Sequence, residues 1–147
     1  MLSVGSRTVT MFRSLFVMLP LALWVGGCAG LTTNHAQTSP SHSDPTLRTR
    51  DIPRAYDAVF DAALDVARTL PRWKIVGEAR AEGLIQAERH TRLFKFVDDV
   101  RIQITQTDDW KVTLNLSSQS RVGKGDFGQN ARNIREFLRE FLAASPP

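Results

Sequence analysis

The chain has 147 residues, of which 42% are hydrophobic and 23% are charged. This is the composition of one ordinary globular domain with appendages, and it excludes a fibrous or wholly disordered protein. The net charge is +4, with basic and acidic residues interspersed rather than gathered, which argues against a nucleic-acid partner.

The first 27 residues have the layout of a bacterial signal peptide. Arg7 and Arg13 precede an apolar run from Leu15 to Val25, and two glycines close the run. A run of about eleven residues is shorter than the roughly 20 that a transmembrane helix needs. We therefore expect residues 1–27 to be a lipoprotein signal peptide that is removed. Met11 begins an equally good leader, so either Met1 or Met11 could be the start.

Cys28 follows this leader directly and completes a recognisable four-residue pattern. Val25-Gly26-Gly27-Cys28 resembles the lipobox of bacterial lipoproteins, and the resemblance implies that the Cys28 thiol receives a diacylglycerol. Cys28 is the only cysteine, so it cannot form an intramolecular disulfide after export. The alternative is that Cys28 is simply a small residue near an ordinary cleavage site.

Lipidation would place the protein in the cell envelope. Acyl chains contribute about 0.8 kcal/mol per buried CH₂, so the mature chain would stay on its membrane. Ala29 follows the cysteine, which by resemblance to the enterobacterial sorting rule implies the outer membrane, with the domain facing the periplasm. The expected partners are this membrane and other envelope proteins or the cell wall.

Residues 28–46 have the composition of a flexible tether. After the cysteine they are rich in Ser, Thr and Pro, and Leu31 is the single large apolar residue. Such a segment cannot bury a core, and it suits an extended linker. His35 and His42 lie in it without the other ligands that a metal site would need, so we expect no metal.

The folded domain is expected over residues 47–143, followed by a disordered tail, residues 144–147. Apolar residues at helical spacing predict a helix from about Asp51 to Leu70, with Asp51 as N-cap and Pro53 at an early helical position. Four strands are predicted over residues 73–78, 84–91, 94–106 and 110–120, with short polar turns typical of antiparallel hairpins. A closing amphipathic helix is predicted over residues 129–143.

Alternation gives the last two strands one buried face each. Phe94, Phe96, Val100, Ile102 and Ile104 share one parity in the third strand, as do Trp110, Val112, Leu114 and Leu116 in the fourth. Two helices with one apolar face each would pack on that side of the sheet. The fold class is therefore α+β, a four-stranded antiparallel meander in the order α-β-β-β-β-α, with a fifth strand if residues 47–50 form one.

Two stretches of the domain carry a family resemblance. Phe96 to Ile102, then Ser118 to Asn130 with Arg132, Ile134 and Phe137, resemble the bacterial and plant family catalogued as domain of unknown function 1499. The resemblance covers about Tyr56 to Leu142, departs from the family upstream, where a Pro-Asn-Cys-Val type segment is lacking, and implies no activity. Tyr56 to Glu88 also resembles the helix-grip lipoproteins of outer-membrane assembly, which implies an envelope role by analogy.

Asp98 is the most informative candidate site residue. Alternation places it on the inner face with Val100 and Ile102, where an ionised carboxylate is costly unless it is paired. Arg121 is the natural partner, and the pair would join the ends of two strands. A β-bulge at Asp98 and Asp99 that turns both side chains outward is the alternative.

A ligand site is the further hypothesis for these residues. Asp98, Arg121 and Asp126 could converge on a small polar or anionic molecule beside the Gly-rich loop 121–128, although its spacing is neither a P-loop nor a dinucleotide motif. Asp126 or Asn130 capping the last helix would explain the same residues without a ligand. The candidate cluster, for binding or structure, comprises Asp98, Asp99, Arg101, Ser118, Ser120, Arg121, Asp126 and Asn130.

No catalytic constellation accompanies this cluster. Nucleophilic catalysis needs a nucleophile, a base and an orienting group together, and His90 is the only histidine of the expected domain. We therefore expect no catalytic residue and no cofactor. The expected function is that of a lipid-anchored, non-catalytic binding or structural module. A small-ligand binder is the alternative, and a hydrolase using Asp98 or Asp99 with Asp126 ranks third.

Overall fold

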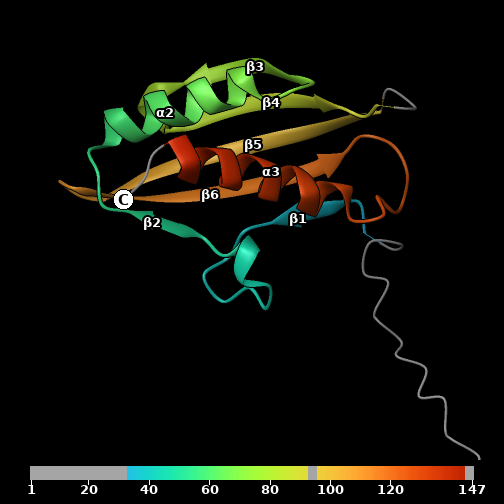
Figure 1. The fold of residues 1–147 in the computed structure, drawn as a ribbon, viewed down its shortest axis with the longest axis horizontal. Coiled ribbons are helices and arrows are strands. Elements are labelled where there is room, and N and C mark those ends of the chain that lie inside the picture. Colours follow the sequence, from blue (N-terminus) through green and yellow to red (C-terminus); the bar gives the residue numbers. More distant parts are fainter. Residues whose placement is uncertain (1–32, 93–95, 145–147) are drawn as a thin grey trace, which may run out of the picture.

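The structure is a computed structural model that describes residues 33–92 and 96–144. Both helices lie on the same face of one antiparallel sheet (Figure 1). The predicted α+β class and the four-stranded meander are confirmed. The elements in chain order are β1 (His35–Gln37), the 3₁₀ helix η1 (Pro45–Leu47), β2 (Arg50–Ile52), α2 (Tyr56–Thr69), β3 (Trp73–Ala79), the 3₁₀ helix η2 (Arg80–Glu82), β4 (Leu84–His90), β5 (Val97–Asp108), β6 (Lys111–Ser120) and α3 (Gln129–Ala144).

The sheet is wider than the predicted meander because two short strands share one edge. Its order is β1-β6-β5-β4-β3, and β2 also pairs with β6. β2 lies beside residues 112–114 of β6, and β1 lies beside residues 117–119. The fifth strand that we expected at residues 47–50 lies at Arg50–Ile52, and β1 is an additional strand.

The expected flexible tether was wrong for residues 33–46. β1 pairs with β6, and the buried Thr38 hydroxyl accepts a hydrogen bond from the Leu116 amide at 2.9 Å. Asp44 binds the Arg135 guanidinium of α3 at 2.5 Å. Composition failed here because a short edge strand needs few apolar side chains when the neighbouring backbone supplies its hydrogen bonds. Cys28 and the rest of the expected tether lie outside the described residues.

The core lies between the helices and the inner face of the sheet. β5 contributes Val100, Ile102 and Ile104, and β6 contributes the next layer of apolar side chains. Phe60 of α2 and Phe137 of α3 are completely buried against them. Among residues 33–92 and 96–144, neither helix is long and apolar enough to cross a membrane.

The start of β5 differs from the prediction. The strand begins at Val97 rather than at residue 94, so Phe96, which alternation placed on the buried face, precedes the strand and is 46% exposed. Phe94 lies outside the described residues.

Further boundaries also differ from the prediction. α2 begins at Tyr56 because Asp51 belongs to β2, where it accepts a hydrogen bond from the Thr113 hydroxyl at 3.0 Å. Trp110 is 73% exposed, because it lies in the turn between β5 and β6, outside the alternation. α3 continues to Ala144, one residue into the expected tail, and residues 145–147 lie outside the described part.

Gly83 provides a test of this architecture. It has φ +66°, and a Cβ at this position would lie 1.9 Å from the Ile104 carbonyl oxygen. We expect Gly83→Ala to lower the free energy of unfolding by at least about 2 kcal/mol, since both backbone strain and a clash with β5 oppose it. Urea denaturation of the purified chain measures this change.

Gly123→Ala is the matched control. Gly123 also has positive φ, +92°, but the nearest atom to its Cβ position is 3.6 Å away. Only the backbone penalty of about 1 kcal/mol should apply. Equal destabilisation by the two substitutions would contradict the close approach of Gly83 to β5.

Candidate functional site: a buried polar cluster beside an arginine cleft

The inner faces of three elements become polar at one end of the core. Ser118 and Ser120 continue the face of β6 that carries Leu116, and Asp98 continues the inner face of β5. Asn130 and Asn133 do the same on α3, at helical spacing with the buried Ile134 and Phe137. These five buried side chains, Asp98, Ser118, Ser120, Asn130 and Asn133, form what we call the polar cluster.

Hydrogen bonds connect all five members of the polar cluster. The Asp98 carboxylate accepts from the Ser120 hydroxyl at 2.6 Å and from the Asn133 amide at 2.8 Å. The Ser118 hydroxyl donates to Asn130 Oδ1 at 2.6 Å and accepts from Asn133 Nδ2 at 3.1 Å. Asn130 Nδ2 donates to the Asn34 carbonyl at 2.8 Å. Such a connected network tolerates burial, because its polar atoms find partners.

Arg89 supplies the cation opposite the buried carboxylate. It pairs with Asp98 in the register of β4 and β5, and it is only 8% exposed. Its Nη2 lies 3.8 Å from Glu136 Oε2 of α3, and its Nε has no hydrogen-bond partner within the described part of the chain. Burial lowers the pKa of the Arg89 guanidinium, while the carboxylate of Glu136 opposes that shift. The guanidinium nevertheless stays charged at neutral pH.

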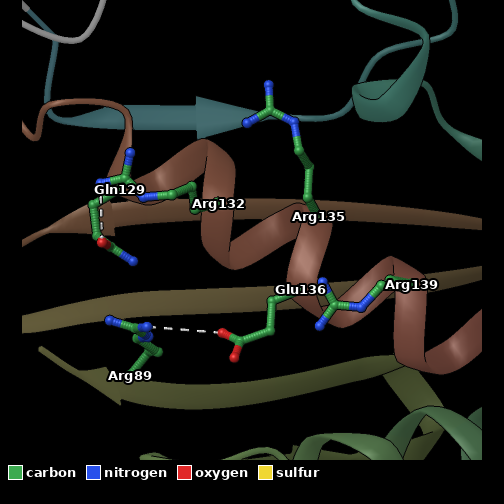
Figure 2. A pocket seen from close by; sticks show the side chains of 6 residues that line it. All are labelled: Arg89, Gln129, Arg132, Arg135, Glu136 and Arg139. Atoms are coloured by element: carbon green, nitrogen blue, oxygen red, sulfur yellow. Dashed lines mark hydrogen bonds and ion pairs between the residues drawn. The ribbon is translucent and has the colours of Figure 1, made fainter. Parts of the chain in front are cut away.

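Arg89 lines a cleft between α3 and the sheet, which we call the arginine cleft. Its volume is about 360 Å³, and Figure 2 shows its lining residues, Arg89, Gln129, Arg132, Arg135, Glu136 and Arg139. Arg135 points away from Arg89 toward η1, where it binds Asp44. Arg132 donates to the Phe127 carbonyl and to Gln129 Oε1. Arg139 forms an ion pair with Glu140, which lies outside the lining, through its Nε at 2.9 Å. Glu136 is the one carboxylate among the six lining residues, beside four arginines.

The structure brings together four of the predicted site residues and places a fifth beside them. Asp98, Ser118, Ser120 and Asn130 belong to the polar cluster. Asp126 caps α3, because its carboxylate accepts from the amides of Gly128 at 2.8 Å and Asn130 at 2.7 Å. The capping alternative thus describes Asp126.

The predicted Asp98–Arg121 pair was wrong. Arg121 follows β6 with its side chain on the open face of the sheet, where it binds Asp99 at 2.6 Å and Glu88 at 2.8 Å. These two carboxylates raise the pKa of Arg121. The strand pairing is regular at Asp98, so no bulge turns it outward, and Arg121 does not converge with it on a ligand.

Arg101 also lies apart from the polar cluster. It is exposed on the open face, opposite Ser117 in the register of β5 and β6. Side chains alternate between the faces of a strand, and Arg101 has the parity of Asp99 rather than that of Asp98. The candidate set therefore divides between the two faces of the sheet.

Sequence reasoning missed the residues that form the cleft. Arg89 shares strand parity with the apolar Ile85 and Ala87, and Asn133 shares helical spacing with Asn130. Strand parity and helical spacing are thus the signals that point to these two residues. Arg132, Glu136 and Arg139 carry no comparable signal, since charged residues on an amphipathic helix usually form its solvated face.

The comparisons identify a family without an assigned activity. The chain belongs to the family described as protein of unknown function (DUF1499), whose family model matches residues 29–141. The resemblance seen in the sequence is thereby confirmed. No curated protein matches the chain.

Several solved structures are similar at low identity. The di-domain ARO/CYC BexL from the BE-7585A biosynthetic pathway has 14% identity and a TM-score of 0.48, and the match covers 76% of this chain but 45% of that one. Zhui aromatase/cyclase from Streptomyces sp. R1128 has 15% identity and a TM-score of 0.39, covering 74% and 84%. TTHA0849 from Thermus thermophilus has 10% identity and a TM-score of 0.36, covering 76% and 99%. The chain thus spans less than half the length of the first of these.

The contribution of Asp98 to stability can be tested by comparing it with Asp99. Asp98→Asn removes the charge opposite Arg89. It also replaces one acceptor oxygen by an amide NH₂, which then faces the donor group of Ser120 or Asn133. We expect the free energy of unfolding to fall by about 2 to 3 kcal/mol. Asp99→Asn makes the same change in an exposed ion pair, and such pairs contribute at most about 1 kcal/mol to the free energy of unfolding. Urea denaturation should separate the two variants, and similar losses would refute the central role of Asp98.

Proposed function

We propose that this chain is a lipid-anchored protein of the bacterial cell envelope whose domain binds a small anionic ligand in the arginine cleft. The observation that carries ligand binding is the state of Arg89. Its guanidinium is removed from water, lines the cleft and keeps an Nε without a hydrogen-bond partner in the described chain. A buried charge of this kind favours a partner of opposite sign.

The carboxylates of the protein itself do not fully satisfy the Arg89 guanidinium. Both oxygens of Asp98 already accept from Ser120 and Asn133. Glu136 Oε2 is 3.8 Å from Arg89 and also lies 3.4 Å from the indole nitrogen of Trp73. A carboxylate or phosphate group in the cleft could accept charge-assisted hydrogen bonds from Arg89, Arg132 and Arg139, and guanidinium groups suit both anions.

A non-catalytic role is supported by the placement of the titratable residues. His90 lies 3.5 Å from Glu88 on the open face, away from the polar cluster. Of the carboxylates in the hydrolase hypothesis, Asp98 and Asp126 each already accept two hydrogen bonds. Asp99 is paired with Arg121 on the open face. Binding therefore has more support than hydrolysis.

The proposed envelope location depends on the sequence around Cys28. The basic leader, the short apolar run and the Gly-Gly-Cys ending support export and lipidation. The absence of any other cysteine leaves acylation as the clearest use for this thiol. The outer membrane, with the domain facing the periplasm, is the proposed site.

Anion binding can be measured with citrate and pyrophosphate by isothermal titration calorimetry of the full chain in detergent. We expect salt-sensitive binding to at least one probe. Arg132→Gln and Arg139→Gln should each weaken it about tenfold, because each removes one charge-assisted contact. Arg101→Gln, an equal charge change on the open face, is the control. Failure of both probes to bind, or equal weakening by all three variants, would refute the proposed site.

Lipidation can be measured by growing cells with a clickable fatty acid. The parent chain should carry the label, whereas Cys28→Ala should not, because the acceptor thiol is gone. Sedimentation with membranes is compared only for chains that have lost the leader, since a retained apolar leader would itself hold the precursor on the membrane. Immunoblotting for the retained leader would identify the unprocessed precursor. Equal labelling of the two chains would exclude Cys28 as the anchor.

A further inference from the structure

Two loops at the polar end of the domain expose large hydrophobic side chains. Phe96 lies just before β5, and Val122 and Phe127 lie between β6 and α3. They are 46%, 61% and 74% exposed, respectively. All three line one groove of about 450 Å³, which shares Gln129 and Arg132 with the arginine cleft. We call these three residues the loop patch. Clustered exposed hydrophobic side chains are typical of an interaction surface.

The N-terminal chain joins the domain at the same end. The Asp126 amide donates to the Thr33 carbonyl at 3.1 Å, and Asn34 Nδ2 donates to the Gly123 carbonyl at 2.9 Å. In Figure 1 the start of β1 accordingly lies beside the loop between β6 and α3. Residues 33 and 34 are therefore bound directly to the loop that carries Val122 and Phe127.

The distance from the proposed lipid to this loop is short. Cys28 precedes Thr33 by five positions, and an extended chain spans at most about 3.6 Å per residue. The reach is thus at most about 18 Å. A lipid on Cys28 would hold the loop patch close to the bilayer surface, whichever path these residues take.

Phe127 is exposed to solvent and has an unfavourable backbone conformation. Its φ is +52°, in the left-handed region that an aromatic residue rarely adopts. With most of its ring exposed, Phe127 contributes little to the core. Strained residues of this kind are concentrated at functional positions, which favours a role for the exposed ring outside the core.

The charges beside the loop patch also fit a lipid surface. Arg92, which lines the groove, and Lys124, which lies between Val122 and Phe127, are both exposed. Aromatic and aliphatic side chains with adjacent basic residues suit the interface of a bilayer that contains anionic lipids. We propose that the loop patch docks on the membrane that holds the Cys28 lipid. This proposal rests on the lipid anchor of the proposed function.

A single introduced cysteine can report on this contact, because an acylated Cys28 does not react with thiol probes. Lys124→Cys places a polarity-sensitive NBD fluorophore within the loop, and Trp110→Cys places it in the turn between β5 and β6. Both chains are purified from membranes of a lipoprotein-processing bacterium and reconstituted into phosphatidylethanolamine and phosphatidylglycerol vesicles. We expect blue-shifted emission and quenching by spin-labelled lipid at position 124 but not at position 110.

Phe127→Gly, added to the Lys124→Cys chain, tests the aromatic contact itself. Glycine accepts the left-handed conformation, so the fold should be retained and the unfolding temperature should not fall. The blue shift and lipid quenching should decrease by at least about half, because apolar burial drives interfacial binding. Trp110→Ala is the matched control, since Trp110 is equally exposed but lies away from the loop patch, and it should leave the signal unchanged.

These measurements distinguish membrane docking of the loop patch from the lipid anchor on Cys28. Equal emission and quenching at positions 124 and 110 would overturn docking alone. A blue shift at position 124 that needs no lipid and rises with protein concentration would overturn it in favour of contact between copies of the chain. Reaction of the probe with Cys28 in the parent chain would refute the lipid anchor, and the docking proposal would fall with it.

Discussion

The buried carboxylate of Asp98 is the constraint on which the polar end of the domain depends. Once removed from water, it needs hydrogen-bond donors and a nearby cation. β6 and α3 supply the donors, Ser120 and Asn133, and β4 supplies Arg89 opposite it. Three elements therefore meet around one side chain. The apolar face of α3 alone would allow it to slide along the sheet, whereas these directional contacts favour one position.

The same contacts determine the character of the arginine cleft. Each oxygen of Asp98 accepts one hydrogen bond from a neutral donor, and the Arg89 Nε has no hydrogen-bond partner within the described residues. The carboxylate therefore acts on Arg89 through its charge. With α3 held in place, Arg132, Glu136 and Arg139 line the cleft together with Arg89. The arrangement that stabilises the polar cluster thus leaves a partly satisfied guanidinium facing a positively charged cleft. Stability and the proposed anion binding have a common physical origin.

The edge strand β1 connects this site to the N-terminal part of the chain. Thr33 and Asn34 bind the loop that follows β6, and the Asn34 carbonyl accepts from Asn130 of the polar cluster. With the lipid that we propose on Cys28, the domain would be held close to the membrane rather than on a long tether. The loop patch and the arginine cleft share Gln129 and Arg132, so the proposed membrane contact and ligand site would be neighbours.

The local pattern of the sequence was enough to predict α2, α3, the four-stranded meander and the inward position of Asp98, because alternation and helical spacing record which face of each element is apolar. The leader that we expect before Cys28 is likewise predicted from a purely local pattern. Tertiary structure decided that Arg89, rather than Arg121, lies opposite Asp98, and that residues 35–37 complete the sheet. Strand register and edge pairing arise from backbone hydrogen bonds between residues far apart in the chain, and such bonds leave little trace in composition or periodicity.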